Sequence, residues 1–259
     1  MQRRTKPRRQ LQALPSPATL DLRQTALLLD VDGTLLDIAA TPDGVIVPPS
    51  LRADLQRLLE RSGGGVALVS GRTIGTLDRL FAPIALPAIG GHGAEMRIAA
   101  NGTASKRHPP ILGEALRERL HALSHIDPRL LIEDKLHSVA IHYRLAPQRK
   151  KALEREIAVI LSEPGTEQAE ILRGKAVIEI KQRQLDKGTA VRELMTYPPF
   201  VGRRPLFIGD DVADESVFAI LPSLGGAGFS VENLMPGADG VIPSPGHVRK
   251  WLAELAAYA

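Results

Sequence analysis

The chain of 259 residues is long enough to bury a full hydrophobic core and corresponds to one large domain or two modest ones. It contains no cysteine, which excludes disulfides, thiolate metal sites and cysteine nucleophiles and suits a reducing compartment. No apolar stretch approaches the roughly 20 residues that cross a bilayer, and the first residues lack the apolar segment of a secretory signal. We therefore expect a cytoplasmic protein without membrane contact.

The basic charge of the chain is concentrated near its N-terminus. The pI is near 9.5, but five of the 33 basic residues lie in residues 1–10, which leaves 28 basic against 29 acidic residues. The rest of the chain carries no basic stripe interleaved with aromatic residues, the pattern of single-strand nucleic-acid binders. We therefore expect residues 1–19 to form a disordered, solvated arm, and we expect no nucleic-acid partner.

Strand and helix signals alternate over residues 20–102. The run Leu27–Leu29 predicts a buried strand that ends at Asp30 and Asp32, ahead of a turn at Gly33. Short apolar strands separated by helices are typical of a parallel sheet. The further elements expected in this part are a helix around 50–61, a strand at 66–69, a helix at 74–81 and a strand that reaches 90.

Residues 103–182 follow a different pattern. Leucines at helical spacing predict a helix around 112–123, and a second apolar stripe predicts another at 153–161. Several of the remaining segments alternate apolar and polar residues, which indicates an antiparallel sheet with one covered face. The segments expected as strands are 130–135, 138–144, 169–172 and 176–181.

The parallel pattern resumes in residues 183–259. The elements expected there are a helix at 186–195, buried strands at 205–208 and 239–242, and a closing helix at 248–258. The sequence thus predicts an α/β core with a parallel sheet, formed by residues 20–102 and 183–259. Residues 103–182 are expected to form an α+β domain inserted into this core.

Polar residues follow several of the predicted core strands or begin the helices after them. Because ligands of open α/β sheets bind at the carboxyl ends of the strands, these side chains are expected to share one crevice. A group of carboxylates needs a counter-charge, and an all-oxygen ligand set favours Mg²⁺. Lysine and serine beside them suit a phosphate, so the pattern indicates phosphoryl transfer. The residues of this group are Asp30, Asp32, Thr34, Ser70, Lys187, Asp210, Asp211 and Asp214.

In these positions the chain resembles the haloacid dehalogenase superfamily of phosphatases. The four matching motifs, in chain order, are DVDGT at 30–34, Ser70, Lys187 and GDDVADE at 209–215. The resemblance implies a doubly wound, Rossmann-like hydrolase core with an inserted cap domain. It also implies that Asp30 is the nucleophile and Asp32 the general acid and base, with Thr34 in the same catalytic motif.

The same resemblance implies a magnesium site and a phosphate site. Asp30, the backbone carbonyl of Asp32 and Asp210 would hold Mg²⁺, with Asp211 and Asp214 in support. Ser70 and Lys187 would hold the transferring phosphoryl group. Taken singly, however, Ser70 is also a common helix N-cap and Lys187 a common surface lysine. Arg72 stays open between a phosphate or substrate contact and a structural salt bridge.

Strand parity in the insert places a set of acids, bases and a histidine on one face of its sheet. This face could simply be the solvated side of a two-layer domain. A mixed set of this kind also suits sugar hydroxyls, which both donate and accept hydrogen bonds. The residues that share the face are Glu133, Lys135, His142, Arg144, Lys175 and Glu179.

The chain more narrowly resembles trehalose-6-phosphate phosphatases, whose motifs match Gly91–Glu95 in the core and, in the insert, Glu133–Lys135, His142–Arg144, and Gly174 and Lys175 with Glu179. The resemblance implies Mg²⁺-dependent hydrolysis of trehalose 6-phosphate to trehalose and phosphate. It places the six polar-face residues at the disaccharide and puts His92 and Glu95 at the boundary between core and cap. His92 could also be a structural turn residue among glycines.

Three alternatives remain beside this small-molecule phosphatase. A related sugar-phosphate phosphatase would act on sucrose phosphate or mannosylphosphoglycerate, and a phosphomutase would retain the phosphoryl group and shield it from water. A non-catalytic regulatory domain is expected to have lost Asp30, Asp32 or Asp210, and all three are present. We expect a monomeric enzyme.

Overall fold

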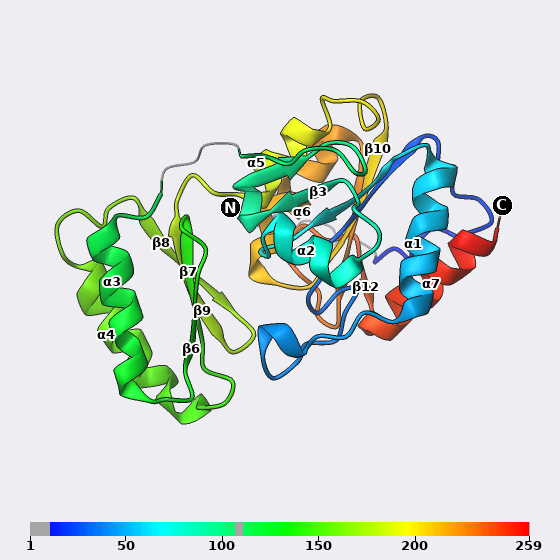
Figure 1. Ribbon diagram of the computed structural model, residues 1–259. Helices are drawn as coiled ribbons and strands as arrows, with labels where there is room; N and C mark the ends of the chain where they lie inside the picture. The colour runs from blue at the N-terminus through cyan, green and yellow to red at the C-terminus, as the bar shows by residue number, and fades with distance from the viewer. Residues whose placement is uncertain (1–10, 107–110, 259) are drawn as a thin grey trace, which may run out of the picture.

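The computed structural model describes residues 11–106 and 111–258. Two lobes lie side by side, and each contains a β-sheet covered by helices (Figure 1). The larger lobe has a hydrophobic cluster on both faces of its sheet, and the smaller lobe has a cluster of its own. The expected class, an α/β fold with a parallel core sheet, is confirmed.

The large sheet has eight strands in the order β12-β11-β10-β1-β2-β3-β4-β5. The strands from β12 to β3 are parallel to one another, whereas β4 and β5 continue the sheet antiparallel. The strands are β1 Thr25–Leu29, β2 Val66–Val69, β3 Ala88–Gly90, β4 Glu95–Arg97, β5 Ser105–Lys106, β10 Arg204–Gly209, β11 Ala227–Val231 and β12 Gly240–Ile242.

The central strand β1 presents apolar side chains to both faces of this sheet, and helices cover both faces. Leu27 and Leu29 of β1 pack in the same cluster as α1 (Pro49–Ser62), α2 (Ile74–Phe81) and α7 (Pro245–Ala257). Ala26 and Leu28 pack on the opposite face with α5 and α6. The helices of this second face are α5 Lys187–Leu194 and α6 Glu215–Ile220. This is the doubly wound arrangement.

The small sheet is antiparallel, in the order β6-β7-β9-β8, and we call its lobe the cap. Helices α3 (Glu114–Ala122) and α4 (Lys150–Leu161) lie on the side of this sheet away from the large lobe (Figure 1). Val139, Ile141, Ile178 and Ile180 pack beneath the two helices. The opposite face of the sheet turns toward the large lobe. The strands are β6 Leu131–Asp134, β7 Ser138–His142, β8 Ala169–Gly174 and β9 Val177–Gln182.

Six short 3-10 helices complete the described part of the chain. Three of them, η1, η2 and η5, lie beside the pocket described below. The six are η1 Pro42–Gly44, η2 Gly91–Gly93, η3 Leu123–Ile126, η4 Pro147–Arg149, η5 Val212–Asp214 and η6 Leu221–Leu224.

Two expected boundaries need correction. The first core segment runs past residue 102, because β5 pairs with β4 in the large sheet and the first cap helix begins only at Glu114. The expected arm at 1–19 is also too long. The Gln12 N–H donates to the Asp239 carbonyl at 2.8 Å, and Trp251 Nε1 donates to the Pro15 carbonyl at 2.9 Å. Residues 11–19 therefore lie against the core, and residues 1–10 lie outside the described part.

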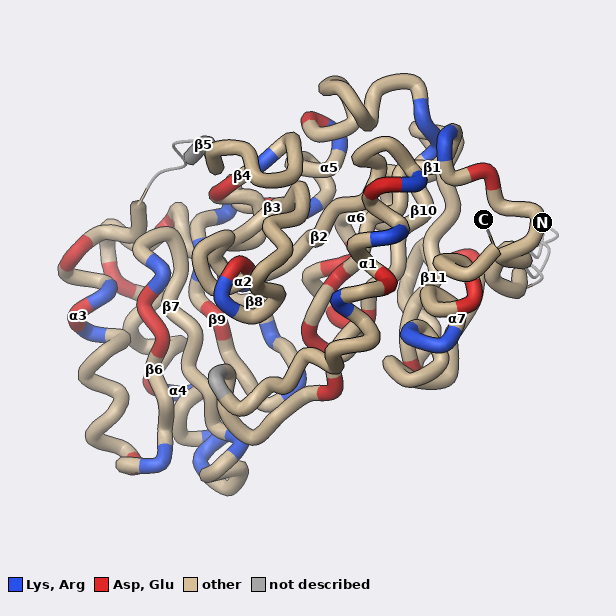
Figure 2. Tube along the Cα trace, turned by 45° about the vertical axis from the view of Figure 1, so that its right-hand side comes forward, with Lys and Arg blue, Asp and Glu red and all other residues tan. Residues whose placement is uncertain are grey.

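No helix within residues 11–106 and 111–258 is long and apolar enough to cross a membrane. Along the described part of the trace, lysine and arginine positions are interspersed with aspartate and glutamate positions in both lobes (Figure 2).

Candidate active site

Three carboxylates meet at the carboxyl ends of β1 and β10. The two strands are parallel neighbours, with Leu29 paired to Ile208, so Asp30 and Asp210 leave the sheet together. An oxygen of Asp30, one of Asp210 and one of Asp214 all lie within 4.8 Å of one another, and all three residues are buried. The turn at Gly33 has φ 80°, and a Cβ there would lie 2.1 Å from Asp210 Oδ2. Only glycine allows this close approach.

Lys187 supplies positive charge to Asp30 and Asp214 of the cluster. It is the first residue of α5, whose N-terminus is capped by the Asp186 side chain. Its Nζ lies 2.8 Å from Asp30 Oδ1 and 2.8 Å from Asp214 Oδ1. Burial alone would lower the pKa of Lys187, but the charges of Asp214 and Asp30 outweigh it and raise that pKa. Lys187 is therefore a buried ammonium and not the surface lysine that its sequence alone would allow.

The pKa values of two of the carboxylates are raised. Burial raises the pKa of Asp30 well above its usual range, against the opposing charge of Lys187. Burial and the charge of Asp214 raise the pKa of Asp210 to about 6. Ionised carboxylates this close need further positive charge, which a bound divalent cation provides.

The donor set fits Mg²⁺. All three residues of the cluster offer oxygen, the ligand atom that this ion prefers. Asp214 has its oxygens engaged by Lys187 and by the backbone N–H groups of Asp210 and Asp211. Asp30 and Asp210 would thus be the direct ligands of a bound Mg²⁺, with Asp214 in support. Asp210 also contacts Thr34 and Lys175. Asp211 accepts a hydrogen bond from the Val212 N–H and lines the same pocket.

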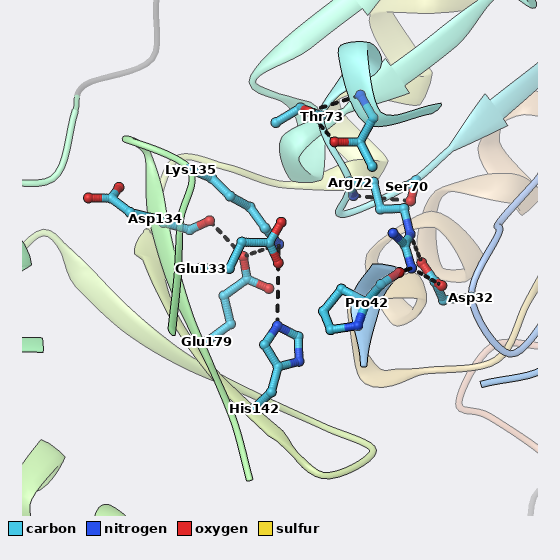
Figure 3. Close-up of polar contacts among 12 residues, drawn as sticks. Asp32, Pro42, Ser70, Arg72, Thr73, Glu133, Asp134, Lys135, His142 and Glu179 are labelled. Carbon is cyan, nitrogen blue, oxygen red and sulfur yellow. Dashed lines mark hydrogen bonds and ion pairs between the residues drawn. The ribbon is translucent and has the colours of Figure 1, made fainter. Parts of the chain in front are cut away.

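Asp32 forms a bidentate ion pair with Arg72. Arg72 Nε and Nη2 each donate to one Asp32 oxygen at 2.7 Å, and Nη2 also donates to the Pro42 carbonyl at 3.1 Å (Figure 3). The Arg72 N–H donates to Ser70 Oγ at 3.1 Å. Of the two possibilities open for Arg72, the structure shows an ion pair, and its partner is Asp32.

A polar network on the cap faces this group across the pocket (Figure 3). The strand register explains why these side chains share one face. Glu133 of β6 pairs with Ala140 of β7, and Ala140 pairs with Glu179 of β9. Lys135 Nζ lies 3.3 Å from Glu179 and 3.8 Å from Glu133. His142 Nε2 lies 3.3 Å from Glu133. The face that parity singled out therefore borders the pocket.

Glu179 is buried at the junction of the two lobes. It accepts hydrogen bonds from Ser138 at 2.6 Å, from Lys135 at 3.3 Å and from His92 of the large lobe at 2.9 Å. Burial alone would raise the pKa of Glu179, but the charges of His92 and Lys135 hold it well below its usual value. His92 adopts φ 54° in η2, an uncommon conformation that aims its ring at the cap.

Two more cap residues contact the large lobe. Arg144 donates from Nη1 to the Ala39 carbonyl at 2.8 Å and from Nη2 to the Lys175 carbonyl at 2.7 Å. Lys175 Nζ lies 2.9 Å from Asp210 and 2.9 Å from Glu232. Both residues line the pocket, and both also tie the cap to the large lobe.

The pocket between the lobes gathers all but two of the residues singled out from the sequence. Thr34 is fully buried behind Asp210, to which its hydroxyl donates at 3.3 Å. Glu95 accepts the Ile74 N–H at 2.6 Å and so caps α2 instead of facing the pocket. Residues missed by the sequence argument are the loop 38–42 and Val45, which form an apolar wall. Their signal was a stretch of more than ten residues without strand or helix pattern after a catalytic motif.

Comparisons with known proteins agree with this geometry. The sequence profile of the trehalose-phosphatase family matches residues 28–235. The chain belongs to the trehalose-phosphatase family. A probable trehalose-phosphate phosphatase of Sinorhizobium fredii is 43% identical over 243 residues, which are 93% of this chain and 91% of that protein. The trehalose-6-phosphate phosphatase of Escherichia coli is 38% identical over 80% of this chain and 77% of its own length.

The fold of this trehalose-phosphatase family member matches solved structures as well. The C-terminal domain of a Candida albicans trehalose-6-phosphate phosphatase superposes with a TM-score of 0.79, covering 92% of this chain and 93% of that one, at 22% identity. At that identity the likeness concerns the fold alone.

Proposed function

We propose that this enzyme is a Mg²⁺-dependent trehalose-6-phosphate phosphatase. The observation that carries the proposal is one pocket with two different walls. One wall holds the buried carboxylates and Lys187, and the other holds the polar network of the cap sheet. A phosphoryl group suits the first wall, and sugar hydroxyls suit the second. The activity of the similar bacterial phosphatases supports this assignment.

In the mechanism that we propose, an oxygen of Asp30 attacks the phosphorus, and the bond from phosphorus to the sugar oxygen breaks. Asp32 protonates that oxygen, and trehalose leaves. Asp32 then takes a proton from water, the water attacks the aspartyl phosphate, and phosphate leaves with Asp30 restored. Lys187 holds Asp30 in place throughout. Asp30, Asp210 and the Asp32 carbonyl would hold Mg²⁺, which neutralises charge on the phosphoryl group when bound.

Phosphate release from a panel of sugar phosphates tests the substrate. With Mg²⁺ present, trehalose 6-phosphate should be turned over at least tenfold more efficiently than glucose 6-phosphate or sucrose 6-phosphate, and a chelator should stop the reaction. Equal or faster turnover of sucrose 6-phosphate would overturn the substrate assignment.

Asp30→Asn should abolish turnover because the amide is a poor nucleophile. Retained activity in that variant, with the fold intact by circular dichroism, would rule Asp30 out as the nucleophile.

The cap wall is best tested at His142. Glu179 is unsuitable, because its burial between Lys135 and His92 makes any change there a change of stability. The His142 side chain is 24% exposed, faces the pocket and contacts only Glu133 in the network. His142→Ala should raise KM for trehalose 6-phosphate about tenfold and leave hydrolysis of p-nitrophenyl phosphate unchanged, since one lost sugar hydrogen bond costs about 1–1.5 kcal/mol. Equal losses on both substrates would remove His142 from the sugar site.

A further inference from the structure

One lysine of the cap bridges two carboxylates of the large lobe. Lys175 lies in the turn between β8 and β9, and its Nζ is 2.9 Å from Asp210 Oδ2 and 2.9 Å from Glu232 Oε2. The turn itself approaches closely, since a Cβ on Gly174 would lie 2.7 Å from Asp211 Oδ2. Partial burial alone would lower the pKa of Lys175, but the hydrogen bonds to Asp210 and Glu232 outweigh it. Lys175 is therefore an ammonium in direct contact with Asp210 of the carboxylate cluster.

The Lys175 contact conflicts with metal binding. Asp210 is one of the oxygen donors of the proposed Mg²⁺ site, and its side chain is only 2% exposed. An ammonium and a divalent cation that share one buried carboxylate repel each other strongly at this range. Lys175 and the metal therefore oppose each other's binding, and by linkage the effect is the same in both directions.

Glu232 lies where it can relieve this conflict. It directly follows β11, its N–H donates to the Ile242 carbonyl at 2.8 Å, and its φ is 66°. A glutamate in the left-handed region is uncommon, so the backbone is held in a costly conformation. That conformation places the carboxylate on Lys175 while leaving it 47% exposed and outside the pocket lining. Glu232 thus reaches the lysine without joining the carboxylate cluster.

We infer that Glu232 is a positioning residue for Lys175. It offers the cap lysine a second carboxylate, so that Lys175 can release Asp210 to the metal while the β8–β9 turn stays docked on the large lobe. Glu232 does not touch the reacting atoms and acts only through Lys175. The inference deepens the proposed function and rests on its magnesium site.

A simple surface ion pair is the alternative. Exposed pairs contribute little to stability, and Glu232 and Lys175 are both partly exposed. A plain electrostatic effect of Glu232 on the metal is a second alternative, because any nearby negative charge favours a cation. Both alternatives predict that the effect of Glu232 on metal binding does not depend on Lys175. A double-mutant cycle separates them from the inference.

The cycle is measured by calorimetric titration of Mg²⁺ into the full-length protein without substrate. Lys175→Met should tighten Mg²⁺ binding about tenfold, and Glu232→Gln should weaken it about fivefold, within the usual range of coupling between sites. In the double variant the affinity should lie within about twofold of Lys175→Met. Glu254→Gln, which breaks an exposed pair with Lys250 on α7, is the charge-matched control and should leave the affinity unchanged. Additive effects of the two substitutions would overturn the role of Glu232.

Hydrogen exchange of residues 172–178 gives a second readout that does not depend on turnover. In the wild type these amides should be equally protected with chelator and with saturating Mg²⁺. In Glu232→Gln they should lose protection about fivefold when Mg²⁺ is added, because Lys175 then has no second partner. Equal protection of that variant under both conditions would overturn the inference. A wild type that binds no Mg²⁺ would overturn the inference and the magnesium site together, whereas binding with an additive cycle would overturn the inference alone.

Discussion

The ion pair between Asp32 and Arg72 gives the proposed acid and base a fixed position. Both oxygens of Asp32 accept hydrogen bonds from one guanidinium, while the Asp32 side chain stays 37% exposed toward the pocket. Arginine forms this fork and lysine does not. Since proton transfer requires the carboxylate within hydrogen-bond reach of the leaving oxygen, we expect Arg72 to act on the rate by orienting Asp32. One arm of the fork must open when Asp32 carries the proton.

Arg72→Lys should therefore lower kcat about tenfold with little change in KM, because the charge stays but Asp32 is held by a single contact. Arg72→Ala should lower kcat further. Steady-state kinetics with trehalose 6-phosphate measure both constants. A rise in KM with unchanged kcat would instead mean that Arg72 binds the substrate directly.

For single residues, the sequence predicts which side chains lie in the site better than it predicts which other side chains they contact. Asp30, Ser70 and Asp210 could be located because residues that end parallel strands meet at one edge. The pairing of Arg72 with Asp32 depends on how two loops approach, which no spacing reveals. The same limit explains Glu95, which shares a motif with His92 but points to the N-terminus of α2.

At the scale of elements, one contact that holds the cap to the large lobe joins the 3-10 helix η2 to the strand β9. His92 of η2 donates to Glu179 of β9, and both side chains are less than 10% exposed. The folded-state pKa of Glu179 lies well below its usual value. An acid with a lowered pKa stabilises the fold fully at pH values above its unfolded pKa, and this stability is lost as the pH falls through the folded pKa.

Glu179→Gln should thus destabilise the protein by about 3 kcal/mol at pH 7, since one partner of a buried charge network is removed. The difference from the wild type should stay constant down to about pH 5 and shrink below it, because the unfolded wild type then takes up a proton at Glu179 while the folded protein does not. Urea unfolding at pH 7, 5.5 and 4 measures it, with Glu156→Gln on the exposed side of α4 as the control. A difference that does not vary with pH would show that the charge of Glu179 is not what stabilises the junction.

Helices and strands with a regular pattern of apolar residues are predictable from the sequence. Strands that contain small residues, or that span only two residues, are not. The helix α2 spans the predicted residues 74–81, and the four cap strands fall on the predicted segments within a few residues. In contrast β11 (AGFSV) escaped prediction because Gly228 and Ser230 break its apolar run. Gly228 is required there, since a Cβ would lie 2.6 Å from Phe218. The strand β5 pairs over two residues only, too few for a pattern.

At the scale of the whole molecule, the active site is a product of two lobes. Strand parity predicts which cap face is polar, but its burial follows only from closure over the carboxylate cluster. Lys175, Arg144 and Glu179 each contact the large lobe. These contacts tie the two walls of the pocket together, and we expect the cap to move as substrate enters.

Metal binding should stabilise the closed molecule as a whole. A ligand that binds only the folded state at a hundred times its Kd adds about 2.7 kcal/mol, which raises Tm by about 5 °C or more in a chain of this size. Millimolar Mg²⁺ should therefore raise the Tm of the wild type, and a chelator should reverse the rise. Asp210→Asn should abolish this shift because a ligand is lost, and should have a Tm at or above that of the wild type in chelator. The reason is that the raised pKa of Asp210, about 6, makes its ionised form a cost to folding at pH 7, a cost that the neutral amide lacks. Differential scanning calorimetry with and without Mg²⁺ measures both expectations, and an unchanged Mg²⁺ shift in Asp210→Asn would place the metal away from the carboxylate cluster.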